Sequence, residues 1–136
     1  MKAWYHISRH WANPIMEISP MLARIDDDYN EQDKVPFIAV APSPEQCLIA
    51  LSSWMDCSPL RLYMTKGIPK AADWVFDYEL TQEHRFYEPR TFKFLRETTP
   101  TKLIKAGVPN MNICGMTVNS IRQSANLVMA AARTVL

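Results

Sequence analysis

The chain has 136 residues, of which 48% are hydrophobic and 21% are charged, and its formal net charge at pH 7 is +1. This length and composition indicate one globular domain, residues 1–136, and the near-neutral charge argues against a strongly basic nucleic-acid-binding protein. No apolar run is long enough to span a membrane, and residues 1–6 lack the apolar core of a signal peptide. We therefore expect a cytoplasmic protein without a membrane partner.

The N-terminal part is expected to hold one strand and two polar or irregular segments. Residues 2–8 favour a strand, with Trp4 and His6 on one face and Tyr5 and Ile7 on the other. A short apolar lid is expected to follow, formed by Ile15, Ile18, Met21 and Leu22. Residues 24–34 are rich in carboxylates, which is typical of a solvated loop. A divalent-cation site is the alternative there, although the glycine of a calcium loop is missing.

The clearest local signal lies in residues 35–55. Residues 37–41 form an apolar run of strand length, which Pro42 ends because proline has no backbone N–H to donate. Ser43 is the expected N-cap of a helix that runs to Met55, and Gln46 completes a capping box. The sequence thus predicts a strand that leads directly into a helix packed on the sheet.

The second half predicts further strands and a closing helix. Residues 60–65 and 74–81 alternate between apolar and polar side chains, which favours antiparallel strands covered on one face. In the first of these segments Tyr63 is expected to point outward. Residues 91–96 predict another strand, residues 101–106 one helical turn, and residues 117–136 a helix with a regular apolar stripe. That stripe suits packing on the sheet better than pairing with a partner helix.

Together these elements predict an α+β fold with a mostly antiparallel sheet, a helix after the second strand and a C-terminal helix packed on the sheet. Sequence motifs for chemistry are few. Three glycines leave no phosphate-binding loop, and no nucleophile elbow is present. The three cysteines lack metal-site spacing, and His6 and His10 do not converge on one ion when they lie on a strand. No metal site is expected.

Two polar features remain as candidates for a site. One is His6, which as a lone histidine is more simply a satisfied structural residue. The other is a polar row on the segment predicted as a strand, which is usually the solvated side of a sheet. Its members are Asp77, Glu79, Thr81 and Glu83. Neighbouring carboxylates also serve in proton transfer or hold a ribose hydroxyl, and spacing alone favours neither function.

The first 85 residues resemble the opening half of small ADP-ribosyltransferase-like domains. The similarity rests on the pair Tyr5-His6 in the first strand and on Ser43-Pro44 at the start of the helix after the next strand. The resemblance implies NAD as the cofactor, with Tyr5, His6 and Ser43 binding it. It also implies a catalytic glutamate, either Glu79 or Glu83. Ile7 stands where the family usually has glycine, so a fold without catalysis is the alternative.

Two functions of other classes stay open. The chain is rich in Trp, Tyr, Met and Arg, which are enriched at protein interfaces, so it is also compatible with a small non-enzymatic binding protein. A phage-encoded inhibitor of a larger host defence complex is one such protein. Single-stranded nucleic acid is a less favoured partner. That hypothesis rests on Arg85, Arg90, Lys93 and Arg96 between Phe86, Tyr87, Phe92 and Phe94. Phe92 and Phe94 point the same way on a strand and are more simply core residues.

Overall fold

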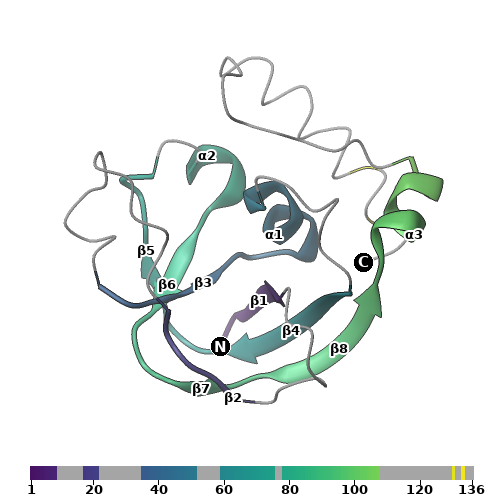
Figure 1. The fold of residues 1–136 in the computed structure, drawn as a ribbon. Coiled ribbons are helices and arrows are strands. Elements are labelled where there is room, and N and C mark those ends of the chain that lie inside the picture. The colour runs from purple at the N-terminus through teal and green to yellow at the C-terminus, as the bar shows by residue number, and fades with distance from the viewer. Residues whose placement is uncertain are drawn as a thin grey trace.

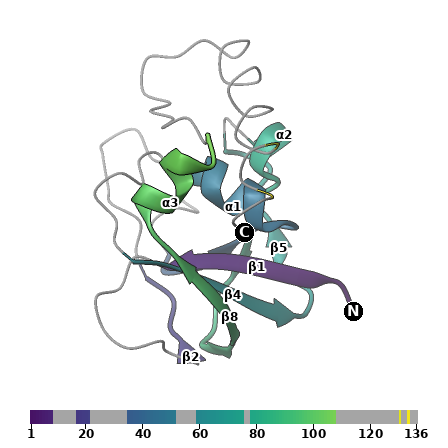
Figure 2. The ribbon, with the colours of Figure 1, turned by 90° about the vertical axis from the view of Figure 1, so that its right-hand side faces the viewer.

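The computed structural model describes residues 1–8, 17–21, 35–51, 59–75, 78–107, 130 and 133. Within these ranges, antiparallel sheets combine with short helices, which confirms the predicted α+β class. Helices α1 (Pro44–Ala50), α2 (Tyr78–Thr81) and α3 (Pro100–Lys105) lie on one side of the strands (Figures 1 and 2). None of the helices in these ranges is long and apolar enough to cross a membrane.

The first sheet has β4 (Leu60–Lys66) at its centre, between β1 (Ala3–Ser8) and β8 (Lys93–Thr98), and both pairings are antiparallel. Side chains on both faces of β4 are buried, and Leu62 and Tyr63 are 3% and 1% exposed. The prediction that Tyr63 points outward is therefore wrong. A central strand with both faces covered buries its polar and aromatic positions together with its aliphatic ones.

The second sheet and one two-stranded ribbon complete the strands described. In the second sheet, β6 (His84–Phe86) lies between β3 (Ile38–Val40) and β5 (Lys70–Ala71), again antiparallel. In the ribbon, β2 (Glu17–Ile18) pairs with β7 (Arg90–Thr91). Because β7 is separated from β8 by one residue, the ribbon continues the edge of the first sheet.

The two sheets meet along one edge of β3. Tyr5 of β1 and Ala41 exchange two backbone hydrogen bonds of 2.9 and 3.0 Å, and Met21 and Phe37 exchange two of 3.0 Å. Alternate residues of a strand direct their backbone groups to opposite edges, so Phe37, Ala39 and Ala41 all address this edge. Between the two bridges, the carbonyl of Ala39 accepts a hydrogen bond from a side chain on β1 instead of a backbone N–H.

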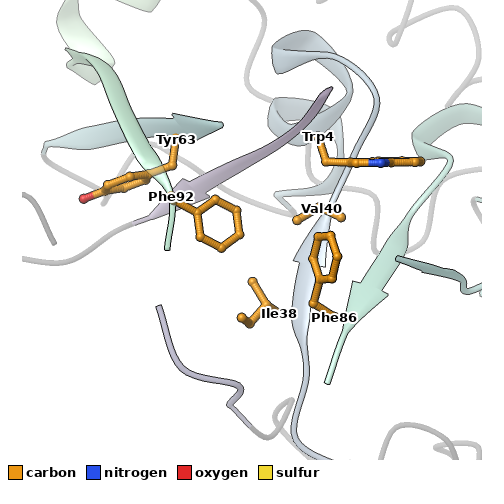
Figure 3. Close-up of a cluster of buried hydrophobic side chains, with 6 residues drawn as sticks. All are labelled: Trp4, Ile38, Val40, Tyr63, Phe86 and Phe92. Carbon is orange, nitrogen blue, oxygen red and sulfur yellow. The ribbon is translucent and has the colours of Figure 1, made fainter. Parts of the chain in front are cut away.

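The main apolar cluster fills the space between the two sheets (Figure 3). Its members are Trp4, Ile38, Val40, Tyr63, Phe86 and Phe92. The indole N–H of Trp4 donates to the carbonyl of Gly67 over 3.1 Å, which satisfies the polar atom of this buried ring. A Cβ added to Gly67 would lie 2.7 Å from Nη2 of Arg90, so a larger residue here would displace the end of the Arg90 side chain.

Residues 74–81 do not form the predicted strand. Trp74 and Val75 lie in a turn, and Tyr78–Thr81 is the single-turn helix α2. Its C-terminal end is closed by Gln82, which has a positive φ of 48° and donates its backbone N–H to the carbonyl of Tyr78 over 2.7 Å. Four helical residues are too few to show a helical period, so alternation in the sequence was misleading here.

Helix α1 begins as expected but ends earlier. Ser43 is the N-cap, Pro44 follows at the first position, and the cap oxygen accepts from the backbone N–H of Gln46. The helix ends at Ala50, since Leu51 has extended backbone angles, so the predicted continuation of this helix through Leu51 is wrong, and residues 52–55 lie outside the described ranges.

Some expectations fall on the parts of the chain that the structure does not describe. These are the whole acidic segment at residues 24–34, Ile15 and Leu22 of the predicted lid, and all but two residues of the closing helix. Of the other lid residues, Ile18 packs against the core cluster. Met21 is 62% exposed.

Candidate functional site

A pocket of about 200 Å³ is lined by residues of β1, β3 and α1 and by the segment between α2 and β6. Its polar side chains are His6 from β1 and Thr81 and Glu83 from the segment that leads into β6. Most of the remaining wall is apolar and comes from β3, α1 and Leu51. A few convergent polar groups in an apolar hollow are typical of a small-molecule site, so we call this the β1–β3 pocket and treat it as the candidate site.

The imidazole of His6 is held in one orientation. Its Nδ1 lies 2.8 Å from the carbonyl oxygen of Ala39, which can only accept, so Nδ1 carries the proton. The ring also packs near the rings of Phe92 and Tyr63, with centroid distances of 5.9 and 6.5 Å. His6 therefore has a structural role at the junction of the sheets, and its tautomer is set by a backbone carbonyl.

The carboxylate of Glu83 is paired with a buried guanidinium. Nε and Nη2 of Arg85 both lie 2.7 Å from Oε2 of Glu83, and the side chains are 4% and 18% exposed, respectively. The guanidinium carbon lies 3.7 Å from the ring centroid of Phe37 and 5.1 Å from that of Trp74. Arg85 is thus fixed by ring contacts and the ion pair, and it balances the negative charge that Glu83 brings to the pocket.

The turn after α2 places Thr81 and Glu83 together in the pocket. Thr81 is 1% exposed, and its hydroxyl accepts from the backbone N–H of Glu83 over 3.3 Å. One residue later, β6 begins and His84 pairs with Val40 of β3. The antiparallel register therefore brings Glu83 beside Ala41, at the point where β1 and β3 are bridged.

Cys47 of α1 lines the same pocket, but its thiol is not a nucleophile at neutral pH. Burial raises the pKa of the Cys47 thiol far above its ordinary value, with a further small contribution from Glu45, while the backbone at Ala41 opposes the shift. The Sγ–H donates to the carbonyl of Tyr5 over 3.1 Å. A nucleophilic cysteine needs a thiolate, so Cys47 contributes a wall to the pocket and no covalent chemistry.

The structure separates the site residues expected from the sequence into two groups. His6 and Glu83 line the same pocket. Tyr5 contributes its backbone to the bridge with Ala41, Ser43 caps α1, and Glu79 is exposed on α2, so none of the three lines the pocket. Of the two glutamates that spacing could not distinguish, Glu83 is the one that faces the pocket.

The sequence analysis did not recognise Arg85 as the partner of Glu83. The signal was present, because residues two apart on a strand share a face and opposite charges there form a pair. Arg85 was instead grouped with aromatic residues as a nucleic-acid surface. The structure buries Arg85, Phe86 and Phe92, whose exposed fractions are 4%, 7% and 1%, so these residues offer no exposed stacking platform.

Comparisons with known proteins add no family to this picture: no family model, no curated protein and no solved structure matches the chain. Within the described ranges, no group of three or more His, Cys, Asp or Glu side chains is placed to hold a metal ion. The function therefore has to be argued from the pocket itself. It offers one imidazole, one hydroxyl and one carboxylate paired with a guanidinium, set in an apolar wall.

Proposed function

We propose that this protein binds NAD or a related nucleotide in the β1–β3 pocket and transfers ADP-ribose to a macromolecular target. The observation that carries the proposal is the meeting of His6 and Glu83 in one pocket, although they lie far apart in the sequence. The resemblance to ADP-ribosyltransferase-like domains implies these two roles, nicotinamide binding for the histidine and ribose binding for the glutamate. Those two roles require that His6 and Glu83 line the same pocket, because nicotinamide and its ribose are joined in NAD.

The size and charge of the pocket restrict which part of the nucleotide enters it. Its volume of about 200 Å³ is smaller than the roughly 300–1,000 Å³ of sites that enclose a whole drug-sized ligand. One ring or a ribose fits that volume, whereas a dinucleotide does not. The described residues that line the pocket include a carboxylate and no lysine or arginine, so the pyrophosphate and the second nucleoside would lie outside the pocket.

The proposed chemistry uses Glu83 as a fixed negative charge. When nicotinamide leaves, positive charge develops on the ribose, and a carboxylate already oriented beside it stabilises that charge without reorganising. Arg85 holds Oε2 of Glu83 through two N–H groups and so fixes its direction. His6 would orient the nicotinamide end, because its ring is held by the carbonyl of Ala39.

The test is a titration of the protein with NAD by calorimetry, followed by incubation with labelled NAD and candidate acceptors. Glu83→Gln is expected to abolish transfer. Glu79→Gln is the matched control, because it makes the same chemical change at an exposed position of α2 and should leave transfer intact. The absence of both binding and transfer at millimolar NAD would refute the proposal, and equal loss in the two variants would refute the role of Glu83.

A binding protein without catalysis is the second candidate, and the ion pair favours it. Oε2 of Glu83 accepts a hydrogen bond from Nε of Arg85 and forms an ion pair with its Nη2, which is also what a purely structural carboxylate would show. Ile7, a branched side chain, also lines the pocket beside His6. A stoichiometric macromolecular partner that is retained by the variant His6→Ala, Glu83→Gln would support this candidate. Loss of the partner in that variant would count against it.

A further inference from the structure

We propose that Gln46 is a positioning residue that ties α2 to α1 and thereby sets the width of the β1–β3 pocket. Nε2 of Gln46 donates to the carbonyl oxygen of Leu80 in α2 over 3.0 Å. Its Oε1 accepts from the hydroxyl of Ser43 over 2.9 Å, which orients the amide so that its NH₂ group faces α2. One side chain thus belongs to the cap of α1 and to a contact between the helices.

Helix α2 depends on such contacts because it is a single turn. A helix of four residues cannot satisfy its own terminal carbonyls, and one turn is not stable by itself in water. The backbone N–H of Gln82 takes the carbonyl of Tyr78, and Gln46 takes that of Leu80. Gln82, directly after α2, has a positive φ, which is unfavourable for a residue with a side chain. The turn at Gln82 therefore needs contacts with its surroundings to keep its shape.

The hydrogen bond joins the two elements that supply parts of the pocket wall. Helix α1 contributes Cys47 and Ala50 to one side of the pocket, and Thr81 and Glu83, directly after Leu80, form the other side. Without the hydrogen bond from Gln46, the end of α2 is free to move away from α1. Glu83 and Thr81 would move with it, and the thiol of Cys47 would become accessible through the widened opening.

A crossed pair of substitutions separates this role from helix capping. Gln46→Glu keeps an acceptor for Ser43 and retains the capping box, but it replaces the donor to Leu80 by a carboxylate oxygen. Gln46→Lys does the reverse, because it keeps a donor and loses the acceptor. Ser43→Ala is the control that removes the cap and the bond that orients the amide, but keeps the NH₂ group of Gln46 able to reach Leu80, so its effect should be the smaller one.

The readout is the rate at which a thiol reagent modifies Cys47 in the folded protein, with Cys57 and Cys114 replaced by serine. Loss of one hydrogen bond is expected to raise the rate roughly three- to tenfold in Gln46→Glu, because modification follows the local opening equilibrium. Gln46→Lys should stay close to wild type. Urea unfolding of each variant shows whether the increase exceeds that from any loss of global stability.

Equal labelling rates in Gln46→Glu and Gln46→Lys would overturn the inference, as would a rise in Ser43→Ala as large as that in Gln46→Glu. The effect on ligand affinity rests on the proposed function, and Gln46→Glu should weaken NAD binding by a similar factor. If wild-type protein does not bind NAD, the proposed function fails. The labelling rates still decide the role of Gln46, since they require no ligand.

Discussion

Replacing Glu83 with glutamine should destabilise the protein, although the side chain lies in a pocket and not in the apolar core. Its partner Arg85 is 4% exposed and held between Phe37 and Trp74, so this guanidinium cannot turn to water when the carboxylate is removed. Removing one member of a buried ion pair costs about 3–5 kcal/mol. Glutamine keeps an acceptor, and the Glu83 side chain is 18% exposed, so we expect about 2 kcal/mol.

Equilibrium unfolding in urea measures this effect as a lower midpoint with an unchanged m-value. Glu79→Gln, on the exposed face of α2, should change the stability by less than about 0.5 kcal/mol. The double variant Glu83→Gln, Arg85→Met should recover about 1 kcal/mol or more, because an apolar side chain then lies between the two rings without an unpaired charge. A stability of Glu83→Gln within about 0.5 kcal/mol of wild type would refute this reasoning.

Three further predictions concern stability. Trp4→Ala deletes a 5% exposed core ring and its hydrogen bond to Gly67, and should lower the unfolding free energy by about 3–5 kcal/mol in urea titrations. Gln82→Gly relieves a positive φ of 48° and should raise the midpoint, for a gain of about 0.5–1 kcal/mol; a lower midpoint would contradict the reading of strain. The Cys47 thiol has a raised pKa in the folded state, so its contribution to stability is complete below its ordinary pKa of 9.0 and is lost as pH rises above it. Stability should therefore fall more steeply above pH 9.0 in wild type than in Cys47→Ala, by up to about 1.4 kcal/mol per pH unit, as unfolding free energies across pH will show.

The parts of the fold that the sequence predicted are those in which local chemistry decides the structure. Ser43, Pro44 and Gln46 form an N-terminal cap whose partners lie within four residues, so the start of α1 could be predicted without tertiary information. The first strand was also predicted from local alternation. As expected, Trp4 packs in the core and His6 contacts core rings on the same face.

The errors arise where tertiary contacts override local pattern. Tyr63 alternates with aliphatic neighbours, but β4 is covered on both faces, and no local signal tells a central strand from an edge strand. The segment before Gln82 alternates as a strand would, yet its helical turn is held by Gln46, thirty-four residues away from Leu80. Trp74 was expected at the start of a strand and instead lies in a turn, against the guanidinium of Arg85.

The site was predicted in its residue types better than in its geometry. Histidine on the first strand and glutamate after residue 77 were both singled out, but spacing could not choose between Glu79 and Glu83. The choice depends on where α2 ends and β6 begins, because that boundary turns Glu83 toward Ala41 and leaves Glu79 exposed. The boundary lies at Gln82, which has a positive φ. A positive φ is usually predicted from a glycine, and the sequence has glutamine at this position.

The register of the first sheet also determines when the chain can begin to fold during synthesis. Ala3 pairs with Lys66, and Leu60 pairs with Thr98, so neither pairing is a local hairpin. At roughly 5–20 residues per second, a ribosome needs several seconds to make the residues between β1 and the strand that it pairs with. Over that interval Trp4 and Ile7 have no sheet to join. Closing so large a loop is also slow in a free chain, so we expect refolding from urea to take milliseconds to seconds. Both β1 and β8 join this sheet by pairing with its central strand, β4.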